Sequence, residues 1–136
     1  MIRHSIVETS ERTQVVDVTE KALSMVREVV DGLAFFYIPH TTASLLLCED
    51  DSELRADLAK VAGQWLADCR PFRHIRKNNP NTEAHVLSAF GGTGVIVAID
   101  GGRPDLGTYQ NILFLEMDGP KKRELRCKII QGMTNP

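Results

Sequence analysis

The sequence predicts a single α+β domain, residues 1–136, with mainly antiparallel sheets, two long helices and one short helix. The chain has the length of one ordinary domain, and no interior stretch has the composition of a linker. Its apolar content of 43% is enough for a sizeable core at this length. Helical patterns separate the early strand patterns, whereas the late strand patterns follow one another. This order favours α+β over a doubly wound parallel sheet.

The first half of the chain contains four predicted strands and one helix. The strands have branched and aromatic content, at residues 2–8, 13–17, 33–38 and 43–48. Thr19 is expected to cap a helix over residues 20–31, where apolar residues recur at helical spacing until Gly32. The polar segment 39–42 then lies at a junction between two buried strands.

A second long helix is predicted over residues 53–68, with Ser52 as its cap. Five apolar residues form one face of this helix and are expected to belong to the core: Leu54, Leu58, Val61, Trp65 and Leu66. Residues 70–82 are polar, with two prolines and three asparagines, and are expected to form a loop.

The last part of the chain contains one short helix and three strands. The helix is predicted over residues 83–90, before two consecutive glycines, and a buried strand follows at residues 95–99. After a Gly/Pro-rich loop at residues 100–107, strands at 108–117 and 123–130 are expected to close the fold as an antiparallel pair.

Charge and cysteine content exclude several classes of protein. Sixteen basic and eighteen acidic side chains leave a net charge of −2, which produces no field that would attract nucleic acid or an anionic membrane. The three cysteines include no C-x-x-C pair, so free thiols in a reducing compartment are expected. The N-terminus has no signal region and no apolar run could span a bilayer. We therefore expect a cytoplasmic protein without nucleic-acid or membrane partners.

Polar residues concentrate in three stretches, which are expected to converge on one small-molecule site. The first is His40–Ser44, followed by Cys48–Asp51, which includes Glu49. Its hydroxyls and imidazole lie between two buried strands, where such polarity exceeds what a junction requires. The alternative is structural: Thr41 and Thr42 would satisfy backbone groups of the turn, and His40 would hydrogen-bond locally.

The second stretch holds His74, Asn81 and His85. The two histidines are eleven residues apart, a spacing that matches no local metal motif. They would still serve as ligands if the fold brought them to His40, because metal ligands often come from separate elements. The alternative is that each histidine is a structural residue with a local partner.

The third stretch runs from Gly101 to Gln110 and continues at Glu116–Arg123. Arg103 has the fork geometry that binds phosphate or carboxylate, although the loop matches no nucleotide-binding motif. Glu116 and Asp118 lie two residues apart on a predicted strand and should face the same side. Such a pair holds a divalent cation or shares a proton. Alternatively, it is a solvated strand end that nearby basic residues neutralise.

Taken in order, these segments resemble the YjbQ-like family, also called the secondary thiamine-phosphate synthase family. The matching pieces cover nearly the whole chain: His40–Ser44, Glu49, Asn81–His85, Gly102–Arg103, Leu106–Gln110 and Glu116–Arg123. Four positions depart from the family's usual residues, namely Cys48 for Asn, Pro104 for Leu, Tyr109 for Trp and Lys121 for Arg. Tyr109 keeps a ring, but Lys121 cannot make the bidentate contact of an arginine.

The resemblance implies an antiparallel α+β fold, a homotrimer with sites near subunit contacts, and a modest, secondary thiamine-phosphate synthase activity. That reaction joins a pyrimidine-methyl diphosphate to a thiazole phosphate and releases pyrophosphate. It requires a divalent cation and basic groups that stabilise the departing diphosphate. The physiological reaction of this chain stays open.

Under this first hypothesis, a metal-assisted transferase, each candidate residue receives a role. The catalytic candidates are His40, Glu49, His85, Glu116 and Asp118. The substrate-binding candidates are Thr42, Ser44, His74, Asn81, Arg103, Thr108, Gln110, Lys121 and Arg123. The metal, Mg²⁺ or Zn²⁺, would be held by His40 and His85, with His74 or Glu116 as further ligands. The alternatives are a non-catalytic oligomer that binds a metabolite or metal, and a metal-dependent phosphate-ester hydrolase.

Overall fold

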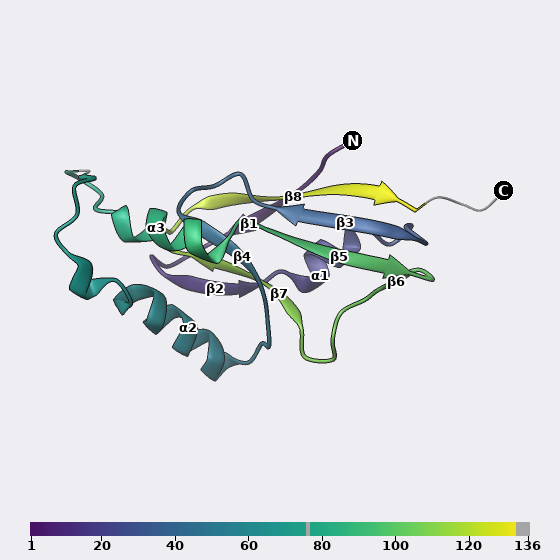
Figure 1. The fold of residues 1–136 in the computed structure, drawn as a ribbon, viewed down its shortest axis with the longest axis horizontal. Helices are drawn as coiled ribbons and strands as arrows, with labels where there is room; N and C mark the ends of the chain where they lie inside the picture. The colour runs from purple at the N-terminus through teal and green to yellow at the C-terminus, as the bar shows by residue number, and fades with distance from the viewer. Residues whose placement is uncertain (76, 133–136) are drawn as a thin grey trace.

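The strands form two antiparallel sheets, which confirms the predicted α+β class (Figure 1). This computed structural model describes residues 1–75 and 77–132. The five-stranded sheet has the order β1 (Arg3–Glu8), β8 (Lys122–Gln131), β3 (Gly32–Tyr37), β5 (Gly94–Asp100) and β6 (Arg103–Pro104). The three-stranded sheet has the order β2 (Gln14–Asp17), β7 (Asn111–Glu116) and β4 (Ala43–Cys48).

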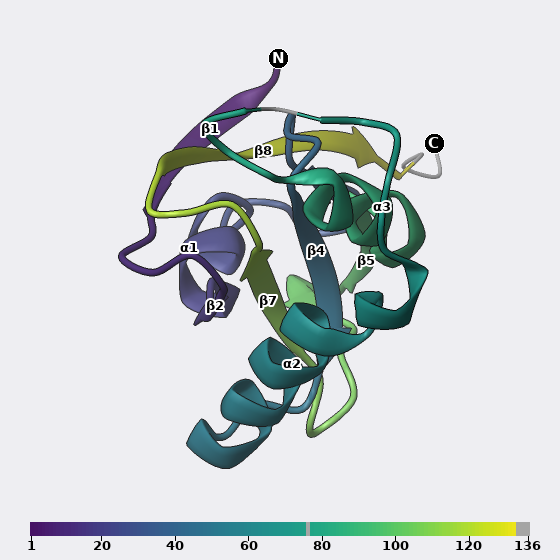
Figure 2. The ribbon, with the colours of Figure 1, turned by 90° about the vertical axis from the view of Figure 1, so that its left-hand side faces the viewer.

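The three-stranded sheet is the middle layer of the fold. One of its faces packs on the five-stranded sheet and on α1 (Thr19–Ser24), in a core that includes Phe36, Leu45 and Phe114. Its other face contacts α2 (Ser52–Gln64) and α3 (Thr82–Gly91) through a second apolar cluster that includes Leu87 and Leu113. Figure 2 shows β4 and β7 side by side, with α2 in front of them.

Burial explains the two kinds of strand pattern in the sequence. Every residue of β7 from Ile112 to Glu116 is buried, because both faces of this strand are covered, and its sequence is a continuous apolar run until Glu116. Strands β3 and β5 alternate between buried and exposed residues, because the outer face of their sheet is uncovered in the single chain.

The predicted closing pair of strands is wrong. Strand β7 pairs with β2 and β4, whereas β8 pairs with β1 and β3, so the turn after Glu116 passes from one sheet to the other. A strand buried on both faces belongs in the middle layer, and a hairpin with β8 would leave one of its faces in water. Strand β7 also begins later than expected, since residues 108–110 form a turn in which the N–H of Gln110 bonds the carbonyl oxygen of Gly107.

The first helix is shorter than predicted, and α2 and α3 are the longer ones. Helix α1 ends at Ser24, and residues 25–29 continue as turns in which Val29 N donates to Val26 O. The branched side chains of Val26, Val29 and Val30 disfavour helix, although the first two are buried. Thr19 is not the cap, since its hydroxyl accepts from Ile112 N at 2.9 Å and α1 has no side-chain cap.

Helix α2 forms where a helix is predicted, but its apolar face is not fully part of the core as expected. Asp51, rather than Ser52, caps it by accepting a bond from Leu54 N at 2.8 Å, and the helix ends at Gln64 before a 3₁₀ turn at Ala67–Cys69. No residue of α2 is buried, and Val61 and Trp65 are 54% and 67% exposed. The helix lies on one face of the middle sheet through Leu58, Ala62 and, just after its end, Leu66, and its most exposed apolar side chains find no cover within one chain.

The third helix and the polar loop before it agree with the predicted positions, apart from residue 76, which lies outside the described residues. Within the described ranges, none of the helices is both long and apolar enough to cross a membrane.

Candidate functional site

A buried ion pair joins the two sheets at the end of β7. Glu116 belongs to the middle sheet and Arg123 to the outer one, and their side chains are 0% and 6% exposed. Arg123 Nε donates to Glu116 Oε1 at 2.8 Å, and its Nη2 donates to Glu116 Oε2 and, at 2.9 Å, to the hydroxyl of Thr42. Glu116 also accepts from the Thr9 hydroxyl at 2.8 Å and from the next two backbone N–H groups. All four oxygen lone-pair directions of this carboxylate are therefore used internally.

Asp118 follows in the turn between the sheets and gathers four polar side chains. Its carboxylate, 2% exposed, accepts from Asn79 at 2.9 Å, from Asn81 at 3.2 Å and from Lys121 Nζ at 2.9 Å. Arg12 Nη2 lies 3.6 Å from its Oδ1. Four segments thus meet at one carboxylate: the polar loop, the start of α3, the turn between β1 and β2 that carries Arg12, and the turn between β7 and β8.

Both carboxylates stay ionised in this environment. Burial alone would raise the pKa of Glu116, but hydrogen bonds from Arg123 and Thr9 outweigh it and lower the pKa. Burial also opposes ionisation of Asp118, and hydrogen bonds from Lys121, Asn79 and Asn81 lower its pKa to about 2. Each acid has its own cationic partner, so the expectation that they share a proton is wrong. The alternative of a solvated strand end is wrong about solvation, because both acids are buried, but its neutralisation by nearby basic residues is confirmed by the pairs Lys121–Asp118 and Arg123–Glu116.

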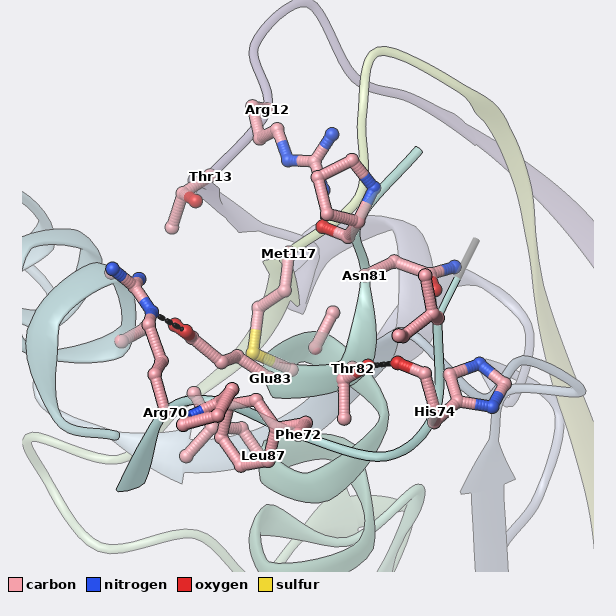
Figure 3. A pocket seen from close by; sticks show the side chains of 16 residues that line it. Arg12, Thr13, Arg70, Phe72, His74, Asn81, Thr82, Glu83, Leu87 and Met117 are labelled. Atoms are coloured by element: carbon pink, nitrogen blue, oxygen red, sulfur yellow. Dashed lines mark hydrogen bonds and ion pairs between the residues drawn. The ribbon is translucent and has the colours of Figure 1, made fainter. Parts of the chain in front are cut away.

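A pocket of about 640 Å³ opens beside the Asp118 cluster, between α2, α3 and the polar loop. Its polar lining includes Arg12, Arg70, His74, Thr82 and Glu83 (Figure 3). The remaining walls are largely apolar: Ala62, Gly63, Pro71, Phe72, Ile75, Pro80, Ala84, Leu87 and Met117.

Two short contacts organise the pocket wall near α3. Arg70 pairs with Glu83, and the Thr82 hydroxyl donates to the carbonyl oxygen of His74 (Figure 3). Arg12 lies on another side of the pocket, held by its own partners. The pocket therefore presents two guanidinium groups fixed by different parts of the chain.

The three candidate histidines lie in two separate places. The rings of His74 and His85 are in edge-on contact, with centroids 5.2 Å apart. His40 accepts a hydrogen bond from Glu124 N at its Nε2, at 2.9 Å. Burial and the nearby Arg123 lower the pKa of His40, so its ring is neutral at neutral pH. His40 therefore has a structural hydrogen bond, but the bond is not local as the structural alternative expected, since its partner lies on β8, 84 residues along the chain.

Two hydroxyls of the first stretch, those of Thr42 and Ser44, are buried, whereas Thr41 is exposed. Thr42 is part of the Glu116–Arg123 network, and its carbonyl oxygen accepts from Met117 N at 3.2 Å. Ser44 is fully buried, and a side chain on Gly91 would clash with its hydroxyl, since a Cβ there would lie 2.8 Å from Oγ. Both hydroxyls lie inside the protein.

The three polar stretches do not all converge within one chain. Arg103, Thr108 and Gln110 are exposed and precede β7, whereas Glu116 ends it. A strand of this length spans about 17 Å, so the two groups lie at opposite ends of it. Gln110 is not inside a strand, and its Oε1 accepts from Gly107 N. Glu49 is exposed in the segment between β4 and α2.

Sequence reasoning assigned no role to the pocket residues Arg12, Arg70, Thr82 and Glu83, although the last two lie in the matching segment Asn81–His85. Arg12 follows Ser10 and Glu11 in a turn, and nothing in its local pattern distinguishes it from a solvated charge. The residues from the candidate set that do line the pocket are His74 and Asn81.

Replacing Arg123 with methionine should destabilise the protein by about 3–5 kcal/mol, because Glu116 would be left as a buried charge without its partner. Urea unfolding of the wild type and of Arg123→Met measures this loss. Arg126→Met is the matched control: Arg126 lies three residues along β8 and pairs with the half-exposed Glu124, so little change is expected. Equal losses in both variants would contradict the assignment.

Asp118→Asn should reduce the loss of stability that the protein undergoes as the pH falls below 4. The folded-state pKa of Asp118 is about 2, below its ordinary value of 3.8, so its stabilisation is complete above pH 4 and is lost as the pH falls toward 2. This contribution is about 2 kcal/mol at neutral pH. Urea midpoints between pH 6 and pH 2 should converge for the wild type and Asp118→Asn at low pH. Asp57→Asn, an exposed α2 carboxylate, should parallel the wild type throughout.

Comparison with known proteins extends over the whole of this fold. A UPF0047 protein of Methanocaldococcus jannaschii is 35% identical over 127 residues, 91% of this chain and 90% of the relative. The UPF0047 protein YugU of Bacillus subtilis is 30% identical over 135 residues, 96% of this chain and 99% of its own.

Solved structures agree with the fold. A hypothetical protein of Aeropyrum pernix K1 superimposes with a TM-score of 0.88 and 34% identity, over 97% of this chain and 99% of that one. A YjbQ/UPF0047 family protein of Clostridium acetobutylicum has a TM-score of 0.86 and 30% identity, over 94% and 99%. The family described as UPF0047 protein YjbQ-like matches residues 3–132. The chain therefore belongs to the YjbQ-like UPF0047 family.

Proposed function

We propose that this protein is a small-molecule enzyme that binds a phosphorylated ring compound in the pocket between α2 and α3. The observation that carries the proposal is the composition of that pocket. Within about 640 Å³ it combines two fixed guanidinium groups with an imidazole, a hydroxyl and an apolar wall. Cations bind a phosphate and an apolar wall covers a ring, while the few polar groups fix its orientation.

The reaction proposed is a transfer of the thiamine-phosphate synthase type, which the family resemblance supports. The thiazole nitrogen attacks the methylene carbon of the pyrimidine-methyl diphosphate. A carbon–nitrogen bond forms, the carbon–oxygen bond to the diphosphate breaks, and pyrophosphate leaves with the electron pair. Negative charge accumulates on the leaving group, so the guanidinium groups of Arg12 and Arg70 would stabilise the transition state.

The proposal includes a divalent cation, whose ligands would be the substrate diphosphate and two imidazoles. Among the described residues, no three His, Cys, Asp or Glu side chains come together as a metal site. The His74 and His85 rings are 5.2 Å apart, so both imidazoles could supply a nitrogen ligand to one ion. Diphosphate oxygens would supply the other ligands, as is usual for Mg²⁺. Such an ion would neutralise the leaving diphosphate.

The residues assigned by the sequence take more specific roles under this proposal. His74 and Asn81 act at the pocket, and His85 acts through its contact with the His74 ring. Lys121 and Asp118 support its wall. Glu116 and Arg123 hold the two sheets together beneath it, since their hydrogen bonds are directed at each other.

We further propose that the protein is a cytoplasmic homotrimer. In this trimer the exposed segment before β7, residues 101–110, of one subunit approaches the site of another. The outer face of the five-stranded sheet carries exposed Leu33, Phe35, Ile96 and Ile130 on neighbouring strands. A contiguous exposed apolar face of this kind is typical of a subunit interface. Association would allow Arg103, Thr108 and Gln110 to contribute to a neighbouring site, which β7 prevents within one chain.

The activity is tested with purified protein, the two thiamine precursors and Mg²⁺. We expect slow formation of thiamine phosphate and pyrophosphate, lowered at least tenfold in Arg70→Gln and by removal of the metal. Arg73→Gln, a neighbouring exposed arginine that does not line the pocket, should keep the wild-type rate. Cleavage of simple phosphate esters without transfer would favour the hydrolase, and saturable binding without turnover would favour the non-catalytic protein.

The oligomeric state is tested by light scattering after size-exclusion chromatography. The wild type should have three times the 15.1 kDa mass of the chain, and Phe35→Asp should shift it toward the monomer. Phe90→Asp changes an aromatic residue that is 80% exposed at the end of α3, away from the sheet face, and should leave the trimer intact. A monomeric wild type at micromolar concentration would refute the trimer.

A further inference from the structure

We propose that the Arg12 side of the pocket is a phosphate subsite, in which Arg12 binds the phosphate and Asp118 is its positioning residue. This inference rests on the proposed function for the identity of the natural ligand, but the subsite itself can be tested with inorganic phosphate. It assigns Asp118 a role different from the direct catalytic one suggested by the sequence.

The Arg12 guanidinium is held in place by three groups. Nη1 donates to Asn79 Oδ1 at 2.8 Å, Nη2 donates to the Pro80 carbonyl oxygen at 2.8 Å, and Asp118 lies 3.6 Å away. Asn79 in turn donates to Asp118. A cation fixed in this way loses little conformational entropy when an anion binds.

The backbone around Arg12 is fixed as well. The turn after β7 donates a hydrogen bond from Gly119 N to the Arg12 carbonyl oxygen at 3.0 Å. A Cβ on Gly119 would lie 2.2 Å from the carbonyl oxygen of Glu11, so only glycine allows the two turns to approach this closely. The position of Arg12 relative to Asp118 therefore depends on both turns.

The guanidinium still has donors for a ligand. It is half exposed, lines the pocket, and carries five N–H groups, of which two donate in contacts between described residues. The Asp118 distance of 3.6 Å is too long for a direct hydrogen bond. The bidentate geometry of the guanidinium suits phosphate oxygens.

The rest of this side of the pocket is also suited to an anion. The first turn of α3, Thr82 to Ala84, lines the same pocket, and this ten-residue helix has no side-chain cap. Its partial positive charge adds to that of Arg12. The acids nearby are already paired, Glu83 with Arg70 and Asp118 with Lys121. The charged side chains of the lining, two arginines and one glutamate, leave one net positive charge.

The test is a titration of the full chain with inorganic phosphate, followed by calorimetry and by the NMR signal of the Arg12 Nε–H. We expect saturable binding that weakens about tenfold in Arg12→Gln and less in Arg12→Lys, which keeps the charge but not the fork. Arg27→Gln is the matched control, because Arg27 lines a separate, smaller pocket, and it should bind phosphate as the wild type does. Urea unfolding checks that each variant is folded.

The role of Asp118 is tested by a double-mutant cycle. Asp118→Asn should weaken phosphate binding in the wild type and have no further effect in Arg12→Gln, whereas a merely structural role would lower affinity in both backgrounds. Absence of phosphate binding, or equal binding in Arg12→Gln and the wild type, would overturn the subsite. Arg12-dependent phosphate binding in a protein that does not turn over the thiamine precursors would support the subsite and reject the proposed reaction.

Discussion

The buried pair of Glu116 and Arg123 is the interaction on which the rest of the structure depends. It connects the last residue of β7 to β8 and so joins the two sheets at the point where the chain passes between them. Two charges without water are stable only when every donor and acceptor is matched. Thr9, Thr42 and two backbone amides add hydrogen bonds to the pair, and the two threonines also fix the end of β1 and the start of β4 at the same place.

The candidate site follows from this junction. Once Glu116 is fixed, the turn that follows places Asp118 beside the turn that carries Arg12, and Asp118 then binds the polar loop through Asn79 and the start of α3 through Asn81. The pocket is the space left between these elements and α2. The charge distribution around the pocket therefore depends on a series of paired charges that begins in the core. A substitution at Glu116 or Arg123 should alter the positions of the side chains in the pocket wall.

Much of the fold could be predicted from local patterns. The strands, the polar loop and the third helix follow from branched residues, prolines and glycines, whose conformational preferences act over a few residues. Strand partners could not be predicted in this way. Strands β7 and β8 are adjacent in the sequence and joined by strong turn residues, yet they belong to different sheets, because the apolar run of β7 requires cover on both faces.

For the candidate site as well, local sequence predicted some features and tertiary contacts decided the others. The sequence by itself determined the family, the α+β class and the residues with unusual chemistry, among them Glu116, Asp118 and the histidines. Only the tertiary structure decided which of them meet: Glu116 with Arg123, His74 with His85, and Asp118 with Arg12, a residue without any local signal. The physical reason is that residue type and spacing specify what a side chain can do, whereas its pKa, burial and partners depend on contacts between segments distant in the sequence.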